Sequence, residues 1–323
     1  MAEKGLRIEN LSVTLTTRGG DLKPVDGVSL DIPQGRIVGL VGESGCGKSM
    51  TAKSIMGLLP PGGKVSGGRI LLDGEDISAY TPKQMRSVNG DRISMVFQEP
   101  MTSLNPVVRV GKQIEESLIL YKDLSPSERK EAVLDIMRKV GIPEVEKRYR
   151  AYPFELSGGL RQRVMIAMAM ICNPELLIAD EPTTALDVTI EAQILKLMED
   201  LRKTFQASIL LITHNLGVVA RTCDTVNVMY MGQIVESCDK ISLFERPLHP
   251  YTLGLLGSLP RIDSRERLTN IKGMVPSLDK VPEGCRFADR CPYAEDACRK
   301  QEPALAEAEA GHFVRCRRQY AVR

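Results

Sequence analysis

The sequence predicts an α/β fold that carries an antiparallel β subdomain, an inserted helical subdomain and a Cys-rich C-terminal extension. Three observations support this class. Short apolar runs are typical of buried strands, and they lie at residues 36–41, 93–97, 176–181 and 208–213. Apolar side chains at helical spacing fill several of the segments between these runs. Four of the eight cysteines gather after residue 284, in a stretch broken by prolines.

The composition is that of an ordinary globular protein, and it disfavours some classes of function. The chain has 323 residues, of which 43% are hydrophobic and 26% charged, and its net charge is +2. So small a charge does not favour a nucleic-acid partner, and the lack of Trp disfavours an RNA reader that stacks bases. No apolar run is long enough to span a bilayer, and the first residues lack the apolar core of a signal peptide. We therefore expect a cytoplasmic protein that reaches any membrane through partners.

The first part of the chain is predicted to be antiparallel β-structure. Residues 6–35 alternate between apolar and polar side chains, with a hairpin turn at residues 18–21. Residues 64–77 repeat the pattern, and turns are expected at Gly67-Gly68 and Asp73-Gly74.

The chain is organised around the loop Gly42-Glu43-Ser44-Gly45-Cys46-Gly47-Lys48-Ser49, which fits the pattern G-x-x-x-x-G-K-[ST]. Its glycines let the backbone come close to a phosphate, so that successive N–H groups form an anion nest. Lys48 brings a cation to the outer phosphates, and Ser49 offers a hydroxyl to Mg²⁺. A buried strand before the loop and a helix expected from Met50 to Leu59, stopped by Pro60-Pro61, disfavour a chance match. The sequence therefore predicts the core of a P-loop nucleotide hydrolase.

Two features follow this core. Gln98 comes directly after the strand at residues 93–97, where its amide could reach Mg²⁺ and an attacking water; a polar strand terminus explains it equally well. Residues 106–155 then place apolar side chains at helical spacing, and Ser125-Pro126 fits a helix start. We interpret residues 106–155 as an inserted helical subdomain.

A second candidate phosphate surface lies at the start of the next helix. Leu156-Ser157-Gly158-Gly159 precedes residues 164–172, which are apolar nearly all round and predict a buried helix. A hydroxyl and exposed N–H groups at the positive end of a helix dipole favour an anion. A plain N-cap formed by Ser157 explains the same residues, and on its own it is the better explanation.

Titratable side chains end two of the predicted strands. Asp180 suits water-mediated Mg²⁺ binding, and Glu181 suits a general base or a group that orients water. Paired acids are costly unless a cation lies beside them, which disfavours a purely structural role. His214 ends the strand at residues 208–213, where ligands bind in α/β sheets; a surface His without a role is the alternative.

Taken in this order, the motifs resemble the nucleotide-binding subunits of ATP-binding cassette (ABC) transporters. The Leu-Ser-Gly-Gly-x-x-Gln stretch from Leu156 to Gln162 is the most specific element, because other P-loop ATPases lack it. The resemblance covers essentially the whole chain and includes Ala185-Leu186-Asp187. Residues 98–106 and 249–252 and the Cys-rich tail resemble the dipeptide/oligopeptide importer branch, to which nickel importers are related. The resemblance implies a RecA-like P-loop NTPase core that hydrolyses ATP to power transport.

The resemblance also implies that two such chains pair head to tail, with nucleotide between the P-loop of one and Ser157-Gly158-Gly159 of the other. Lys48 would hold the phosphates, and Ser49 and Gln98 would ligate Mg²⁺. Asp180 would lie in the outer shell of the ion, Glu181 would polarise the water and His214 would steady the γ-phosphate. Asp187 would link the two sites. The residues so implied around the nucleotide are Gly42, Glu43, Ser44, Gly45, Cys46, Gly47, Lys48, Ser49, Met50, Gln98, Ser157, Gly158, Gly159, Gln162, Asp180 and Asp187.

One departure from the family pattern concerns the base. The family usually stacks adenine on an aromatic residue of the first strands, whereas the first aromatic residue of this chain is Tyr80. We expect an aliphatic contact from residues near Thr16 to Val25 in its place.

The cysteines of the tail form a group of their own. Cys285, Cys291, Cys298 and Cys316 lie in one short segment, with His312 nearby, and such a group suits a metal site in an intracellular protein. The spacing is neither that of a zinc ribbon nor that of a ferredoxin, so zinc, an iron–sulfur cluster and free thiols all stay open. The resemblance to the peptide-importer branch favours a [4Fe–4S] cluster. Cys46 lies in the phosphate loop but need not react, and Cys172, Cys223 and Cys238 are expected to be small buried or strand residues.

The expected division places the first part of the ATP-binding core at 1–90, the Gln98 strand and helical subdomain at 91–160, the second part of the core at 161–250 and the tail at 251–323. The resemblance implies three kinds of partner at the cytoplasmic face of the cell membrane: a second ABC ATPase subunit (homologous, or the same chain in isolation), two transmembrane permease subunits and an extracytoplasmic substrate-binding protein. Nucleic acid is not expected. The alternatives are a nickel or metal-chelate importer and a soluble, non-transport ABC ATPase, which a single cassette and a charge of +2 disfavour.

Overall fold

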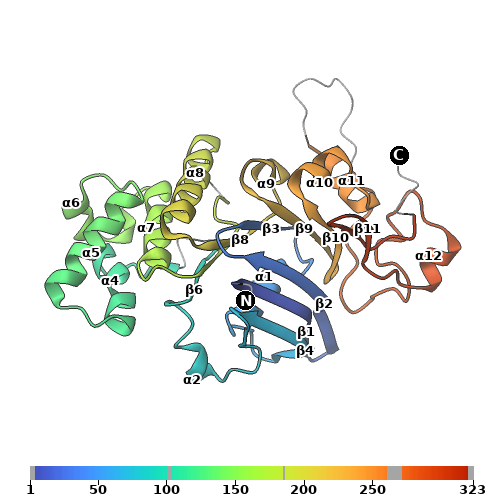
Figure 1. The fold of residues 1–323 in the computed structure, drawn as a ribbon, viewed down its shortest axis with the longest axis horizontal. Coiled ribbons are helices and arrows are strands. Elements are labelled where there is room, and N and C mark those ends of the chain that lie inside the picture. The colour runs from blue at the N-terminus through green and yellow to red at the C-terminus, as the bar shows by residue number, and fades with distance from the viewer. Residues whose placement is uncertain (1–3, 100–102, 185, 260–270, 319–323) are drawn as a thin grey trace. The chain divides into compact units, whose positions relative to one another are not determined.

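The computed structural model describes residues 4–99, 103–184, 186–259 and 271–318. The chain divides into two compact units, and each is described by itself. Unit 1 comprises residues 1–6, 32–36 and 79–211, and unit 2 comprises residues 7–31, 37–78 and 212–323. The prediction of an α/β fold is confirmed, since helices and strands alternate along most of the chain (Figure 1).

Unit 2 holds most of a four-stranded sheet with the strand order β2-β1-β4-β5. Its strands are β1 (Gly5–Thr17), β2 (Gly20–Pro33), β4 (Gly63–Leu72) and β5 (Glu75–Asp76). The expected turns at residues 18–21 and at Asp73-Gly74 are confirmed. The turn expected at Gly67-Gly68 is wrong: both residues lie inside β4, where Gly68 passes so close to Asn10 that a Cβ would lie 2.4 Å from its carbonyl oxygen.

A second group of strands in unit 2 carries the phosphate loop and the tail. These strands follow the order β11-β12-β10-β9-β3, and β3 pairs parallel with β9 whereas β10 pairs antiparallel with both β9 and β12. Two strands of the tail therefore form one edge of this sheet (Figure 1). The strand bounds are Ile37–Val41 for β3, Thr225–Tyr230 for β9, Gln233–Asp239 for β10, Ala306–Glu309 for β11 and His312–Val314 for β12.

The helices of unit 2 are short. They are α1 (Lys48–Ile55), α9 (Leu216–Thr222), α10 (Lys240–Glu245), α11 (Pro250–Gly257) and α12 (Asp296–Lys300). The helix predicted over residues 50–59 is placed correctly but ends earlier than Pro60, which corrects the assignment of the stop signal. Gly57 takes a left-handed conformation, and the N–H of Leu58 bonds the carbonyl of Lys53, which closes the end of α1 before the prolines.

The described part of unit 1 contains three buried strands, and two helices flank the middle one in the sequence. β6 (Ile93–Val96) pairs parallel with β7 (Leu176–Asp180), and β8 (Ser208–Thr213), which begins in this unit, lies beside β7. Every residue of these strands is buried, which explains why the sequence shows continuous apolar runs rather than alternation. The two helices are α7 (Gly158–Met170) and α8 (Val188–Phe205).

The predicted helical insert is confirmed and lies in unit 1 (Figure 1, green). Its apolar stripe of Val133, Ile136, Met137 and Val140 is buried. Ser125 caps α5 in a capping box with Glu128, as the helix-start prediction requires. The other helical elements of this unit are α2 (Pro82–Met85), α4 (Val110–Tyr121), α5 (Pro126–Lys139), α6 (Val145–Tyr149) and the 3₁₀ turn η1 (Pro153–Glu155).

Candidate nucleotide site

The phosphate loop connects the end of β3 to the start of α1, and its path is fixed by glycine. Gly42 and Gly47 have φ angles of 152° and 113°. A Cβ on Gly42 would lie 2.2 Å from the carbonyl oxygen of Met229, and one on Gly47 would lie 2.2 Å from that of Pro24. Both residues therefore need to be glycine, for conformation and for space. The strand–loop–helix context predicted for a P-loop is confirmed.

Lys48 folds back into the loop. Its Nζ donates to the carbonyl oxygens of Gly42 at 2.7 Å and Glu43 at 3.0 Å, and only 6% of the residue is exposed. The loop thus forms a small ring of main chain around a buried cation, at the N-terminus of an eight-residue helix. Such a place attracts an anion. Cys46 is buried beside this lysine, and burial raises the pKa of its thiol, so it is neutral and unreactive as expected.

Glu43 connects the loop to the C-terminal region, which sequence reasoning did not predict. Its carboxylate accepts two hydrogen bonds from Arg290, at 2.6 and 3.0 Å. Its N–H donates to the hydroxyl of Tyr251 at 2.8 Å. The sequence offered one weak signal, since Arg290 directly precedes Cys291 in the group of tail cysteines.

An aromatic cluster supports these two contacts. The rings of Tyr230 and Tyr251 are 4.7 Å apart, and Phe287 lies 5.3 Å from Tyr230, edge to face. The guanidinium of Arg290 lies over Tyr230, 5.8 Å from the ring centre. Tyr230 and Tyr251 are fully buried, and burial raises the pKa of both hydroxyls.

In unit 1, Glu181 and Gln98 lie together. Gln98 Nε2 donates to Glu181 Oε2 at 3.0 Å, and the hydroxyl of Thr184 donates to the same oxygen at 2.9 Å. Glu181 has a φ of 48°, a left-handed conformation that costs energy for a residue with a Cβ and is often found at functional sites. Asp180 precedes it as the last residue of β7 and is 5% exposed.

The predicted second surface lies at the start of α7. Ser157 is its N-cap and accepts from the N–H of Leu160 at 3.4 Å, so the simple capping explanation is confirmed. Ser157 and Gly158 are exposed, which leaves the start of α7 open to a ligand. Gln162 is buried at 2% exposure, and its Nε2 has no partner among the described residues. That position favours support of the α7 start over direct contact with nucleotide.

The remaining predicted site residues lie at element boundaries. Asp187 is the N-cap of α8 and accepts from the N–H of Ile190 at 2.9 Å. His214 directly follows β8 in unit 2 and is exposed. Ala185, which belongs to the predicted Ala185-Leu186-Asp187 motif, and residues 100–102 of the segment after Gln98 lie outside the described residues.

The four tail cysteines line one cavity, together with His249 and Tyr293. None of them is in a disulfide. Burial raises the pKa of Cys285, Cys291 and Cys316, and the neighbouring thiols raise it further. The predicted grouping of the four thiols is therefore confirmed.

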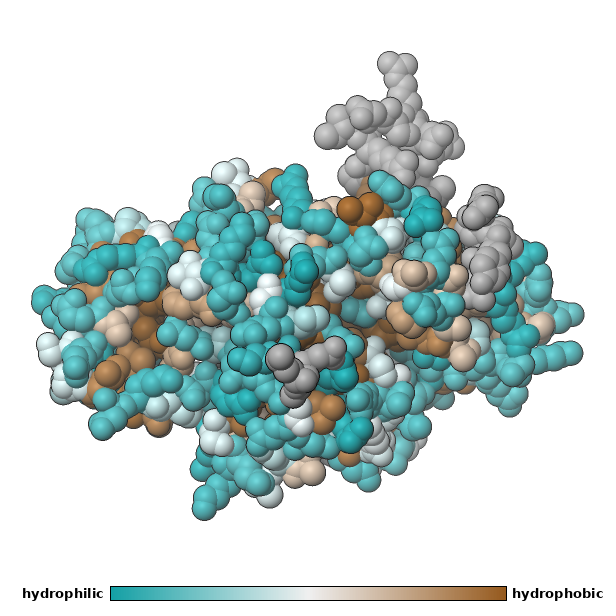
Figure 2. All heavy atoms as spheres, viewed as in Figure 1, coloured by the Kyte–Doolittle hydropathy of each residue, from teal (hydrophilic) through white to brown (hydrophobic). Residues whose placement is uncertain are grey.

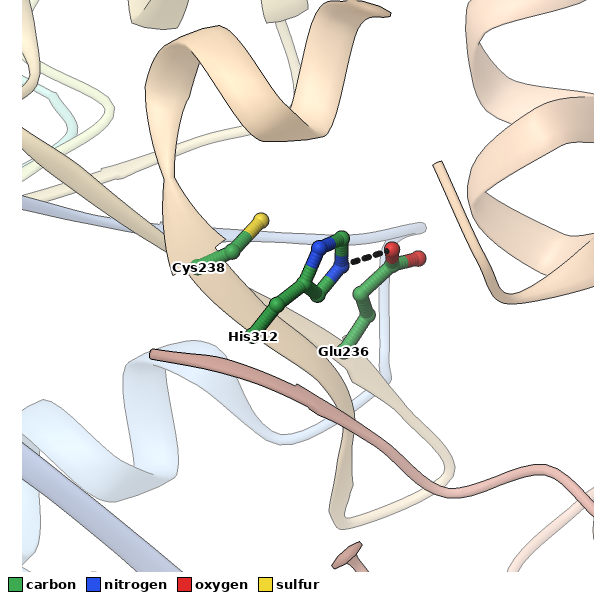
Figure 3. A group of neighbouring side chains, drawn as sticks. All are labelled: Glu236, Cys238 and His312. Carbon is green, nitrogen blue, oxygen red and sulfur yellow. Dashed lines mark hydrogen bonds and ion pairs between the residues drawn. The ribbon is translucent and has the colours of Figure 1, made fainter. Parts of the chain in front are cut away.

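His312, expected near these cysteines, instead joins a buried polar group with Glu236 and Cys238 (Figure 3). Its Nε2 lies 2.7 Å from Glu236 Oε1, and the same carboxylate accepts the N–H groups of Leu248 and His249 at 2.7 and 3.0 Å. Cys238 has a strongly raised pKa because it is buried beside this carboxylate. The carboxylate of Glu236 is already used by these hydrogen bonds, and the thiol of Cys238 is protonated. The group is therefore better explained as a structural contact that links β10, β12 and α11 than as a metal site.

Comparison with known proteins decides the family. The profile described as "ABC transporter" matches residues 25–184, and the profile described as "Oligopeptide/dipeptide transporter, C-terminal region" matches residues 235–298. The oligopeptide transport ATP-binding protein AppD of Bacillus subtilis is 50% identical over 96% of this chain and 95% of its own length. This chain belongs to the ABC transporter ATPases.

Other ABC proteins agree with this assignment. The dipeptide transport ATP-binding protein DppD of Bacillus subtilis is 49% identical over 97% of this chain and 94% of its own. The ATP-binding cassette MJ0796, solved as a dimer bound to ADP and phosphate, matches with a TM-score of 0.66 at 26% identity, over 73% of this chain and 98% of its own. The cassette cbiO1 of Clostridium perfringens matches with a TM-score of 0.66 at 28% identity, over 76% and 92%. The prediction of an ABC ATPase with a P-loop NTPase fold is thus confirmed.

Proposed function

We propose that this chain is the ATP-hydrolysing subunit of an ABC importer for dipeptides or oligopeptides. The observation that carries the proposal is that one chain joins an ABC cassette to a C-terminal region typical of oligopeptide and dipeptide transporters. Relatives named for these substrates are about half identical along nearly the whole chain. A nickel or metal-chelate importer subunit is the second candidate, because the cassette itself does not contact the cargo.

Within each chain, the roles follow from chemistry. Lys48 and the loop amides would hold the phosphates, and the Ser49 hydroxyl and Gln98 amide oxygens would ligate Mg²⁺, a cation that prefers oxygen. Glu181 accepts a proton from the attacking water or orients it, and the hydrogen bond from Gln98 supports this by holding the carboxylate at the end of β7. Asp180 would lie in the outer shell of the ion, and His214 would donate to the γ-phosphate.

Two chains complete each site. The exposed start of α7, with Ser157 and Gly158, presents N–H groups and a hydroxyl that a γ-phosphate on a partner chain would satisfy. Asp187 lies at another helix start and is proposed to link the two sites. Since each half-site lacks donors that the other supplies, ATP favours the closed pair and loss of the γ-phosphate opens it. The dimeric state reported for the MJ0796 cassette supports this arrangement.

The helical subdomain is the proposed docking surface for the two permease subunits. Val107, Leu120 and Phe154 are more than 60% exposed, and hydrophobic residues reach the surface over the part of unit 1 that carries α4 to α6 (Figure 2, brown). None of the helices among the described residues has the length and apolarity that a membrane span needs. Attachment to the cytoplasmic face of the membrane through permeases, with a substrate-binding protein on the other side, fits these facts.

The four tail thiols are proposed to hold a [4Fe–4S] cluster through Cys285, Cys291, Cys298 and Cys316. All four line one cavity, and thiolates are the ligands that iron–sulfur clusters take. Zinc takes the same ligands and is the alternative metal. A bound metal group would link the segments of the tail.

Two experiments test these assignments. In a host strain that lacks this subunit, the wild-type chain should restore uptake of a labelled tripeptide and Glu181→Gln should not; restored nickel uptake without peptide uptake would favour the second candidate. For the tail, anaerobic purification should yield brown protein with about four irons per chain. Colourless protein with one zinc per chain would contradict the cluster.

A further inference from the structure

We propose that Arg290 and Tyr251 are positioning residues for ATP binding, which brace the phosphate loop from the C-terminal tail through Glu43. Every polar group of Glu43 is hydrogen-bonded, either to the tail or within the loop. The carboxylate accepts from Arg290, the N–H donates to Tyr251, and the carbonyl accepts from Lys48 at 3.0 Å and from the N–H of Cys46 at 3.3 Å. A displacement of Glu43 therefore moves the ammonium group that meets the phosphates. The inference deepens the ATPase assignment and rests on it.

The brace is built from buried, rigid parts. The side chain of Arg290 is 5% exposed, and besides Glu43 it donates to the carbonyl oxygens of Lys272 at 3.1 Å and Gly273 at 3.3 Å. A bidentate pair between a guanidinium and a carboxylate fixes direction as well as distance. The Tyr251 hydroxyl is held by a ring that packs against Tyr230 and Phe287. An exposed surface pair would not hold the loop in this way.

A second contact from the tail is connected to the same loop through one turn, and it supports the inference. Arg286 donates to the carbonyl oxygen of Met231 at 2.6 Å and pairs with Asp26. The next residue in the turn, Gly232, donates its N–H to the carbonyl oxygen of Cys46 in the phosphate loop at 2.8 Å. Arg286 and Arg290 each stand beside a tail cysteine in the sequence, Cys285 and Cys291. A change in the order of the segment that carries the tail thiols should therefore change the conformation of the phosphate loop. A change in the loop should equally change the order of that segment.

The test compares Arg290→Gln, Glu43→Gln and Tyr251→Phe with Arg299→Gln, a matched control whose arginine pairs with Asp289 on the exposed surface of the same tail. KM and Kd for MgATP are measured on the full chain, together with kcat. Arg290→Gln and Glu43→Gln should each raise KM and Kd about tenfold, because a loop that is no longer braced binds the phosphates less well. The kcat should stay within about twofold, because Lys48 is retained and saturating MgATP restores the bound shape of the loop. Tyr251→Phe should raise both about threefold, and the control should leave them unchanged.

Two further readouts separate bracing from general destabilisation. The double variant of Arg290 and Glu43 should be no worse than either single variant, because one interaction is lost in all three. MgATP should slow amide hydrogen exchange of residues 285–298 in the wild type but not in Arg290→Gln. Unchanged KM in both single variants, effects that multiply in the double variant, or equal protection in Arg290→Gln would overturn the brace. A wild-type chain that fails to bind MgATP would instead overturn the ATPase assignment.

Discussion

The phosphate loop and the tail are both irregular chain, yet they are held in opposite ways. The path of the loop is confined mainly by main-chain packing, since Gly42 and Gly47 lie against the carbonyl oxygens of Met229 and Pro24 and have no room for a Cβ. The tail from Cys285 to Cys316 contains one five-residue helix and two short strands, and buried charges and thiols hold it together. We infer that the loop lysine mainly controls chemistry, whereas the buried ion pairs of the tail mainly control folding and, at Arg290, also the position of the loop.

The largest expected effect is a loss of ATP hydrolysis while the conformation of the loop is kept. Lys48→Ala should lower the rate of ATP hydrolysis by at least about 100-fold, since a donor prearranged for developing charge is lost. The melting temperature should change little, because the glycine conformations of the loop remain. Lys53→Ala, on the same helix α1, serves as the control for both measurements. A fall in melting temperature that matches the loss of activity would show that the lysine, not the backbone, holds the loop.

The second effect concerns hydrolysis alone. Glu181→Gln should keep MgATP binding and lower hydrolysis by about 10²–10⁴-fold, because the amide cannot take a proton from water. With ATP bound and not consumed, the chain should elute as a stable pair in size-exclusion chromatography with light scattering. Glu175→Gln, whose carboxylate pairs with Arg92 at the start of the same strand, is the control. Rapid turnover by Glu181→Gln would remove Glu181 from this role.

The third effect tests the tail. Arg286→Met should destabilise the protein by about 3 kcal/mol, because it leaves Asp26 and Glu302 without their buried partner. Arg299→Met, which removes an exposed ion pair, should cost less than about 0.5 kcal/mol. Denaturant unfolding measures both. Equal costs would contradict the claim that buried side chains hold the tail.

The smallest effect concerns the N-cap of α8. Like the sequence motif of the loop, this cap depends only on residues that are close in the sequence. Asp187→Ala should destabilise by about 1 kcal/mol through loss of the N-cap of α8, while Asp187→Asn keeps an acceptor and should cost a few tenths. Thermal unfolding reports the difference. A full loss in Asp187→Asn would mean that charge rather than capping matters there.

The same contrast explains what the sequence could predict. The loop, the buried strands and the capping box at Ser125 depend on neighbours within a few residues, so pattern and propensity locate them. The sequence pattern places the end of α1 too late because Gly57, not Pro60, closes the helix. It predicts a turn at Gly67-Gly68 because the close approach to Asn10 involves a distant strand. The pairing of Glu43 with Arg290 spans 247 positions, and neither residue stands out among the 84 charged side chains. No local pattern could have selected it.

The central claim, that two chains complete each ATP site, is tested most directly by mixing two inactive variants. Lys48→Ala lacks a working loop but keeps Ser157, and Ser157→Arg keeps the loop but blocks the start of α7. Each alone should hydrolyse ATP at about 1% of the wild-type rate or less, while both keep the wild-type melting temperature. An equimolar mixture should recover about a quarter of the wild-type rate, since half of randomly formed pairs contain one intact site of two. A mixture as inactive as its components, or full activity of Ser157→Arg alone, would contradict the claim.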